Sequence, residues 1–303
     1  GKSELCNIML FAKEFIYETQ LISAYDIHYD HLLDIRELNP TQLTFIDSGG
    51  YETSNNFDLS ETRKYDRLKK DWNQDLLNSV IDNWTEIYPA VLVSYDDINL
   101  RVSIQNQVDN ALHFFESKKD FLFDFLIKPS QKEQSFINNV EVIDSIDKNY
   151  SKFDIIGVTE KELGNSLFLR MKNILHLRKK LDNEGIYSPI HIFGALDPLS
   201  VILYFIVGAE IFDGLSWLKY DYFNGCASYI NNSCVLNNMD SIFQTDGEIR
   251  MEMIRNNIYK LEILKNLLID FKSNSNYAIF DQIAGKGYGD MIKEIISKFE
   301  SKV

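Results

Sequence analysis

The chain has few cysteines, and they follow no pattern. Only three occur in 303 residues, at Cys6, Cys226 and Cys234. An odd number at irregular spacing argues against a disulfide framework and favours a reducing compartment. We expect all three to be small buried hydrophobic residues.

Long hydrophobic runs and an amino-terminal leader pattern are also missing. No apolar stretch approaches the roughly 20 residues that a membrane-spanning helix needs. The first residues, GKSELCNIML, do not read as a signal peptide. We therefore expect a cytoplasmic protein without a membrane partner.

The chain has fewer basic than acidic residues. The chain has 31 Lys and Arg against 45 Asp and Glu, a net charge of −14. Such a chain repels phosphate backbones at long range, whereas most nucleic-acid binders carry a basic face. The negative net charge argues against a protein that binds DNA or RNA without help from a partner. It leaves room for a local basic strip or for a partner subunit that supplies one.

What the chain does contain is a regular alternation of short apolar runs and helical stretches. Continuous apolar strands separated by helices are typical of parallel strands buried on both faces. The predicted strands are 6–12, 42–48, 89–97, 121–129, 152–159, 188–195 and 208–214. The predicted helices between them are 69–86, 101–118, 131–147, 162–183 and 198–207.

This alternation predicts an α/β fold, a (β/α)8 TIM barrel. Seven strand–helix units without a dinucleotide-binding glycine fingerprint favour the barrel over an open doubly wound sheet. The eighth strand is 229–237 or 277–281, and residues 247–271 and 286–300 read as helices. We expect a barrel domain over residues 1–245, and C-terminal helices over 246–303 that pack on the barrel or complete it.

Two apolar runs end in an aspartate followed by glycine: Asp47, before Ser48-Gly49-Gly50, and Asp213, before Gly214. In a barrel the carboxyl ends of the strands share one face, where active sites form. Two carboxylates there can serve as nucleophile and acid/base partner around one glycosidic bond. Other polar residues at predicted strand ends are Asp96, Asp97, Lys128, Thr159, Glu160 and Asp197, the last of which is expected to cap the helix that begins at Pro198.

Four motifs in this order resemble the tRNA-guanine transglycosylase superfamily, which includes the queuine and archaeosine tRNA-ribosyltransferases. DSGGY at 47–51 resembles the family's DSGGF signature, and SYDD at 94–97 resembles its strand end with a base-reading aspartate. FDIIGVTEKELG at 153–164 and HIFGALDPLSVILYFIVGAEIFDG at 191–214 resemble its glycine-bearing strand and the stretch that leads to its nucleophile. The match covers residues 45–217.

The resemblance implies a TIM-barrel enzyme that exchanges a purine on a nucleic acid for a 7-deazaguanine with retained configuration. It implies Asp213 as the nucleophile that forms a covalent ribosyl-enzyme, and Asp47 as the general acid/base. The target nucleotide has to be flipped out of any duplex. The residues implied to bind the base are Asp96, through its N–H edge, Ser48, Gly49, Gly50 and Gly157, through the backbone, and Tyr51, by stacking.

The sequence departs from the family in three places. The clustered cysteines and distal histidine of a zinc site are missing, so we predict no metal and no other cofactor. Lys128, before Pro129, falls where the family has a base-reading glutamine; it either contacts the base or another ligand, or is an exposed lysine at a strand end. After the nucleophile, the tRNA enzymes have a basic zinc subdomain, but this chain has an aromatic-rich segment with Trp217, Tyr220, Tyr222 and Phe223, which either stack on unpaired bases or pack against a helix.

These departures favour DNA slightly over tRNA as the polynucleotide, because the DNA-directed branch of the superfamily also has a Trp soon after its nucleophile. The expected partners are DNA or tRNA, with the help of a partner subunit, and a 7-deazaguanine base; an oligomer is compatible with the sequence. Two other classes stay open. One is a non-catalytic or regulatory paralogue subunit, and the other is a base or nucleoside N-glycosidase acting on small substrates.

Overall fold

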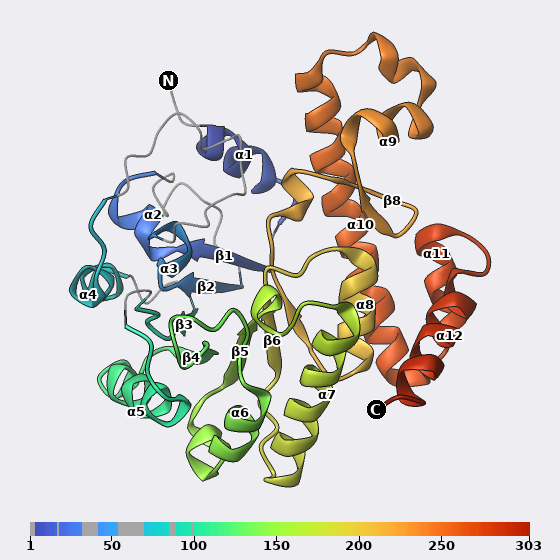
Figure 1. Cartoon of the computed structure of the whole chain (residues 1–303). Coiled ribbons are helices and arrows are strands. Elements are labelled where there is room, and N and C mark those ends of the chain that lie inside the picture. Colours follow the sequence, from blue (N-terminus) through green and yellow to red (C-terminus); the bar gives the residue numbers. More distant parts are fainter. Residues whose placement is uncertain (1–3, 17, 32–41, 54–69, 85–88, 98–99) are drawn as a thin grey trace. The chain divides into compact units, whose positions relative to one another are not determined.

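The computed structural model describes residues 4–16, 18–31, 42–53, 70–84, 89–97 and 100–303 (Figure 1). The chain divides into two compact units. The first contains residues 1–162 and 179–191, and the second contains 163–178 and 192–303.

The first unit is built on parallel strands that follow one another in sequence order. They are β1 (Thr19–Ser23), β2 (Leu43–Asp47), β3 (Ala90–Val93), β4 (Leu122–Ile127) and β5 (Ile155–Thr159). All four residues of β3 are buried, and so are the first four of β5. This burial on both faces explains why these strands read as continuous apolar runs. Their carboxyl ends meet at one edge.

Helix α1 (Glu4–Ala12) precedes β1, and the other helices of this unit follow its strands. They are α2 (Ala24–His28), α3 (Gly50–Thr53), α4 (Gln74–Asp82), α5 (Ile104–Phe115) and α6 (Asn139–Ser145), with the 3₁₀ turns η3 (Lys148–Lys152) and η4 (Glu160–Glu162). Helices α4, α5 and α6 lie along the outside of the strands (Figure 1). Helix α5 begins at its N-cap Ser103 and buries Val108, Ala111 and Phe115, three or four residues apart, on one face.

Strands β6 (Ile190–Phe193) and β7 (Ile211–Phe212) complete a seven-stranded sheet of order β1-β2-β3-β4-β5-β6-β7. An α/β fold with seven sheet strands in sequence order is compatible with a TIM-like barrel. Within the described residues, the eighth strand is not found. Both segments that could have supplied it are helical: residues 229–237 contain α9 (Ile230–Asn237) and residues 277–281 contain η7 (Tyr277–Phe280).

The second unit is mainly helical. Its elements besides β7 are most of α7 (Leu167–Asn183), α8 (Pro198–Ile206), η5 (Ser216–Leu218), the antiparallel pair β8 (Asp221–Phe223) and β9 (Cys226–Ser228), α9, η6 (Met239–Phe243), α10 (Asp246–Asn274), η7, α11 (Asp281–Ala284) and α12 (Tyr288–Glu300). Helices α10 and α12 confirm the helices predicted at 247–271 and 286–300. The predicted division at residue 245 stays a prediction.

The first predicted strand is wrong. Residues 6–12 lie in α1, and the first strand is β1, at 19–23. Ile8 and Ala12, four positions apart, are buried, as expected for one face of a helix. A short apolar run does not distinguish a buried helix from a buried strand by its periodicity, and this explains the error. Across the residues that the structure describes, no helix is long and apolar enough to cross a membrane.

Candidate functional site

Two aromatic residues, Trp72 and Tyr25, pack against the turn that follows β2. Gly49 has φ +84°, and a Cβ added there would lie 2.7 Å from Nε1 of Trp72 and 3.0 Å from Cβ of Tyr25. The Trp72 indole Nε1–H donates to the carbonyl of Ser48 at 2.7 Å, and the amide of Gly49 donates to Oδ2 of Asp47 at 3.2 Å. Glycine is therefore required at position 49 both by conformation and by space.

The same turn carries a buried hydroxyl. Ser48 is 1% exposed, and its Oγ has no hydrogen-bond partner among the described residues. A buried hydroxyl without a partner is costly, so it marks a position where a ligand can supply the missing hydrogen bond. Tyr51, in α3, is half-buried, and its stacking role stays a prediction.

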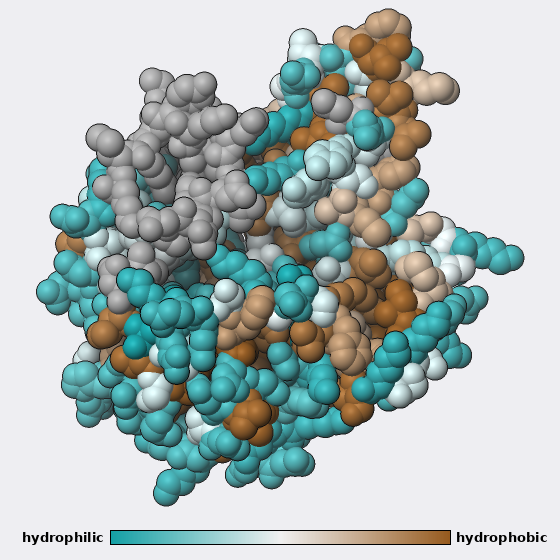
Figure 2. Space-filling model, in the orientation of Figure 1, coloured by the Kyte–Doolittle hydropathy of each residue, from teal (hydrophilic) through white to brown (hydrophobic). Residues whose placement is uncertain are grey.

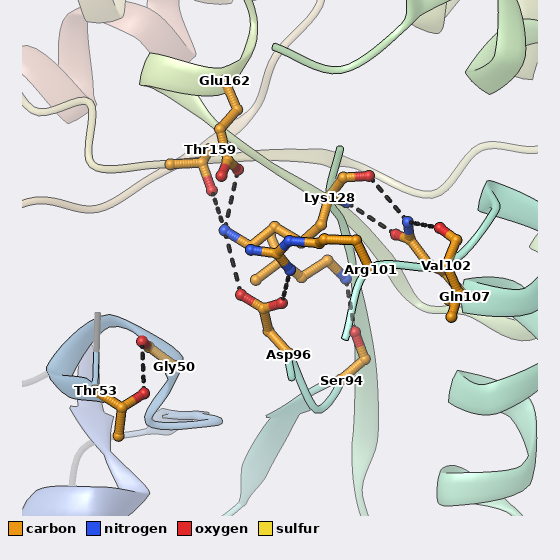
Figure 3. Close-up of polar contacts among 11 residues, drawn as sticks. Gly50, Thr53, Ser94, Asp96, Arg101, Val102, Gln107, Lys128, Thr159 and Glu162 are labelled. Carbon is orange, nitrogen blue, oxygen red and sulfur yellow. Dashed lines mark hydrogen bonds and ion pairs between the residues drawn. The ribbon is translucent and has the colours of Figure 1, made fainter. Parts of the chain in front are cut away.

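The turn after β2 touches the end of β3 at Asp96. A Cβ added at Gly50 would lie 3.3 Å from Oδ2 of Asp96, so the lack of a side chain at Gly50 lets the carboxylate approach. The guanidinium of Arg101 pairs with Oδ1 of Asp96, and Nζ of Lys128 lies 3.5 Å from Oδ2 (Figure 3). Three residues predicted from the sequence, Gly50, Asp96 and Lys128, therefore come together.

Lys128 joins the ends of three neighbouring strands. Besides its ion pair with Asp96, its Nζ donates to Oγ1 of Thr159 at 3.1 Å and to Oε2 of Glu162 at 3.0 Å (Figure 3). Its side chain is 14% exposed, so Lys128 is not an exposed lysine at a strand end. Burial is the largest single influence and lowers the pKa of Lys128, but the carboxylates of Glu162 and Asp96 outweigh it and raise the pKa above its ordinary value.

A glutamine on α5 fixes the backbone at Lys128. The Gln107 side chain accepts from the amide of Lys128 at 3.0 Å and donates to its carbonyl at 3.0 Å. It also donates to the carbonyl of Val102 at 3.0 Å. The lysine is therefore positioned by contacts on its backbone as well as on its ammonium group.

The structure adds three residues to the cluster at these strand ends: Arg101, Gln107 and Glu162. The sequence alone gave no reason to select them, because they lie in a loop, on a helix and in a 3₁₀ turn that follow the strands. Gly157, by contrast, lies where it was expected, in β5. It is buried and pairs in register with Leu126 of β4. Its contact with a base stays a prediction.

Asp213, in the second unit, follows β7. Its Oδ1 accepts a hydrogen bond from the amide of Gly194, at the end of β6, at 3.0 Å. A Cβ added at Gly214 would lie 3.2 Å from the backbone carbon of Gly194 and 3.2 Å from Cβ of Leu196, so the glycine permits a close approach between these strand ends. Asp47 belongs to the first unit and Asp213 to the second.

The aromatic segment after Asp213 is tied to α10 by one buried asparagine. Asn257 is fully buried and donates to the carbonyls of Trp217 at 2.8 Å and Tyr220 at 2.7 Å, and it accepts from the amide of Tyr222 at 2.9 Å. Tyr222 is itself buried, and its hydroxyl bonds to Oγ of Ser216 at 2.7 Å. For Tyr222 the packing alternative is confirmed.

One structural prediction is confirmed in the second unit. Asp197 is the N-cap of α8: its Oδ1 accepts from the amide of Ser200 at 3.1 Å, and its Oδ2 accepts from the amide of Ala227 at 2.6 Å. In the first unit, Nδ1 of His191 lies 2.7 Å from Oδ2 of Asp124, and both side chains are buried.

The expectation of buried cysteines is wrong for two of the three. Cys226 is exposed and Cys234 is partly exposed, and neither forms a disulfide with a described residue. Cys226 is the first residue of β9, and the two-stranded hairpin of β8 and β9 leaves its side chain exposed. The side chain of Cys6 lies outside the described residues. Where the structure describes the chain, no group of three or more His, Cys, Asp or Glu side chains could hold a metal ion.

No protein-family model matches the chain, and no curated protein matches it significantly. The assignment of a function therefore depends on the residues described above.

Proposed function

We propose that this protein is a transglycosylase-like pentosyltransferase that exchanges a guanine-type base in a nucleic acid for a 7-deazaguanine. One observation carries the proposal. Asp47, Asp96, Lys128 and Thr159 lie at the carboxyl ends of four successive parallel strands, the edge at which α/β sheets bind ligands. Gly50, Asp96 and Lys128 are already in contact there.

The proposed chemistry is a double displacement. A carboxylate oxygen of Asp213 attacks C1′ of the target nucleotide as the glycosidic C1′–N bond breaks, while Asp47 delivers a proton to the departing base. Asp47 then removes a proton from the incoming 7-deazaguanine. The base displaces the carboxylate from C1′, which regenerates Asp213 and retains the configuration. Neither step requires an oxidant or a reductant.

DNA is slightly favoured over tRNA as the polynucleotide, and a partner subunit is proposed to help hold it. Residues 220–249 contain no Lys, Arg or His, so this stretch has no cation to contact phosphates. It exposes large apolar side chains instead, and Figure 2 shows hydrophobic surface gathered over α9 and the start of α10. The most exposed of these side chains are Tyr229, Leu236, Met239, Ile242 and Phe243. Exposed apolar surface of this kind is typical of protein interfaces, and a basic partner would complement the acidic chain.

A base-exchange assay tests the proposal. The protein is incubated with radiolabelled 7-deazaguanine and either guanine-containing DNA or tRNA, and label in the polynucleotide is counted. We expect incorporation by the wild type and by Asp270→Asn, a control at an exposed aspartate near the end of α10. We expect none with Asp213→Asn. Each assay is repeated with a host-cell extract that supplies the partner. The proposal would be contradicted if neither DNA nor tRNA incorporated label, with or without the extract.

A non-catalytic paralogue subunit is the second candidate. The observation in its favour is that Arg101 and Lys128 engage the two oxygens of Asp96, the residue proposed to read the base. A non-catalytic subunit would not bind the free base and would not incorporate it into the polynucleotide. It would instead raise the activity of a catalytic partner. An N-glycosidase acting on small substrates would instead release free base from nucleosides without inserting another.

A further inference from the structure

The ammonium group of Lys128 has its donors engaged. A lysine carries three N–H donors, and three acceptors surround Nζ of Lys128: Oγ1 of Thr159 at 3.1 Å, Oε2 of Glu162 at 3.0 Å and Oδ2 of Asp96 at 3.5 Å. These contacts link three strand ends (Figure 3). A ligand could reach this ammonium group only by displacing one of the three.

Arg101 differs from Lys128 in this respect. Its side chain is 17% exposed, and Nη1 pairs with Oδ1 of Asp96. A guanidinium has five N–H donors, and in the described part of the chain the remaining donors of Arg101 have no hydrogen-bond partner. These unused donors are therefore available to a bound ligand.

We infer that Arg101, and not Lys128, reads the carbonyl oxygen of the base, and that Lys128 is a positioning residue for Asp96 and Glu162. The inference rests on the proposed function. Asp96 and Arg101 together form a carboxylate beside a guanidinium. This pair complements a lactam edge, in which an N–H donor lies next to a C=O acceptor, as at positions 1 and 6 of a guanine-type base.

The surroundings favour a neutral carbonyl over a phosphate as the acceptor. Two carboxylates, Asp96 and Glu162, lie in the same cluster as Arg101 and Lys128, so the formal charges of these four side chains cancel. A dianionic phosphate would be repelled by both carboxylates. The neighbouring turn contributes Gly50, which lies close to the Asp96 carboxylate, and Ser48, whose buried hydroxyl has no partner among the described residues.

Binding of free bases tests the inference without turnover, because a free base has no glycosidic bond. The dissociation constants of 7-deazaguanine and of 7-deaza-6-thioguanine are measured by calorimetry. The two bases share the N–H edge, but sulfur is a much weaker acceptor than oxygen. We expect the wild type to bind the oxo base about 10-fold more tightly, the effect of one charge-assisted hydrogen bond.

The variants divide the roles of the two cations. Arg101→Met, which has no donor, should bring the ratio of the two dissociation constants near 1, and Arg101→Lys, which keeps the charge, should recover part of it. Lys128→Met should weaken both bases alike and keep the ratio. Arg255→Gln, at an exposed arginine on α10, is the control and should change neither constant. Unfolding curves confirm that each variant is folded.

The outcomes separate the inference from the function. A ratio that survives in Arg101→Met, or one that collapses in Lys128→Met alone, would overturn the inference while leaving base binding intact. Competition by inorganic phosphate would also overturn it, since the guanidinium would then bind an anion. Failure of the wild type to bind either base would refute the proposed function and the inference together.

Discussion

The turns after β2 and β7 share a pattern, an aspartate followed by glycine, but they are supported in different ways. At β2, the Asp47 carboxylate accepts from the amide of Gly49 within its own turn, and Trp72 packs over that glycine. At β7, Asp213 accepts from the amide of Gly194, which lies at the end of another strand. The first aspartate accepts an amide of its own turn, and the second accepts an amide from a neighbouring strand end. The same short motif can therefore present a carboxylate at a strand end by two physical routes.

The largest expected effects separate the chemical roles of the two aspartates. Asp213→Asn keeps an Oδ1 acceptor for Gly194 but cannot form the ester, and we expect base exchange to fall by about 10⁴-fold or more. Asp47→Asn removes only proton transfer and should cost about 10²- to 10⁴-fold. The measurement is the initial rate of base exchange. The assignment of roles would be wrong if neither variant lost activity, or if only Asp47→Asn lost activity.

Alanine at the two glycines should show how differently the turns are built. Gly49→Ala combines a positive φ with a contact at 2.7 Å and should destabilise the protein by about 3 kcal/mol. Gly214→Ala meets atoms at 3.2 Å without a positive φ and should cost about 1 kcal/mol.

Gly185→Ala is the matched control for these variants, because Gly185 has φ +69° and nothing within 4 Å of an added Cβ. It should cost about 1 kcal/mol from conformation alone. Urea unfolding measures all three. Equal losses for Gly49→Ala and Gly185→Ala would show that Trp72 does not press on the turn.

Asn257 tests the support of the segment after Asp213. Asn257→Ala leaves two carbonyls and one amide of that segment without their partner and should destabilise the protein by about 2 kcal/mol. Asn266→Ala, at an asparagine on the same helix whose amide bonds only to Glu262, should cost less than about 0.5 kcal/mol. Hydrogen exchange should locate the loosening at residues 217–222, and an even loss of protection along the chain would argue against this role.

The smallest effect concerns the start of α10, the helix that carries Asn257. The backbone amide of Thr245 donates to Glu248, and so does the Thr245 hydroxyl; these two hydrogen bonds lower the pKa of Glu248 below its ordinary value. The stability from this ionised capping box is therefore present above the ordinary pKa of a glutamate and lost as the pH falls through the lower, folded-state pKa.

Glu248→Gln removes the charge but keeps a hydrogen-bond acceptor. The variant should be less stable than the wild type at pH 7 and should match it once the pH has fallen below the folded-state pKa. Thermal unfolding across that range measures the difference. A gap between the two proteins that stayed constant with pH would exclude an ionic contribution.

The sequence predicted the fold best where strands are buried on both faces. Six predicted strands, from 42–48 onward, correspond to β2 through β7, because each is a continuous apolar run bounded by polar residues. The run at 6–12 proved helical, and the segments considered for an eighth strand are helical as well. Short runs of this kind take their structure from tertiary packing, which their own residues do not reveal.

The candidate site was predictable only in part, for a related reason. Asp96 and Lys128 end adjacent parallel strands, so their proximity follows from topology. Arg101, Gln107 and Glu162 follow those strands in segments whose paths are set by packing, so their contacts with Lys128 and Asp96 could not be read from the spacing. For this reason we propose Arg101, rather than Lys128, as the residue that reads the carbonyl of the base.

The most direct test of the central claim is mass spectrometry of the covalent intermediate. The protein is mixed with the guanine-containing polynucleotide, quenched in acid, digested with nuclease and protease, and its peptides are sequenced. The account predicts a ribosyl or deoxyribosyl adduct on Asp213 that is absent in Asp213→Asn. An adduct on another residue, or an adduct that persists in Asp213→Asn, would contradict it.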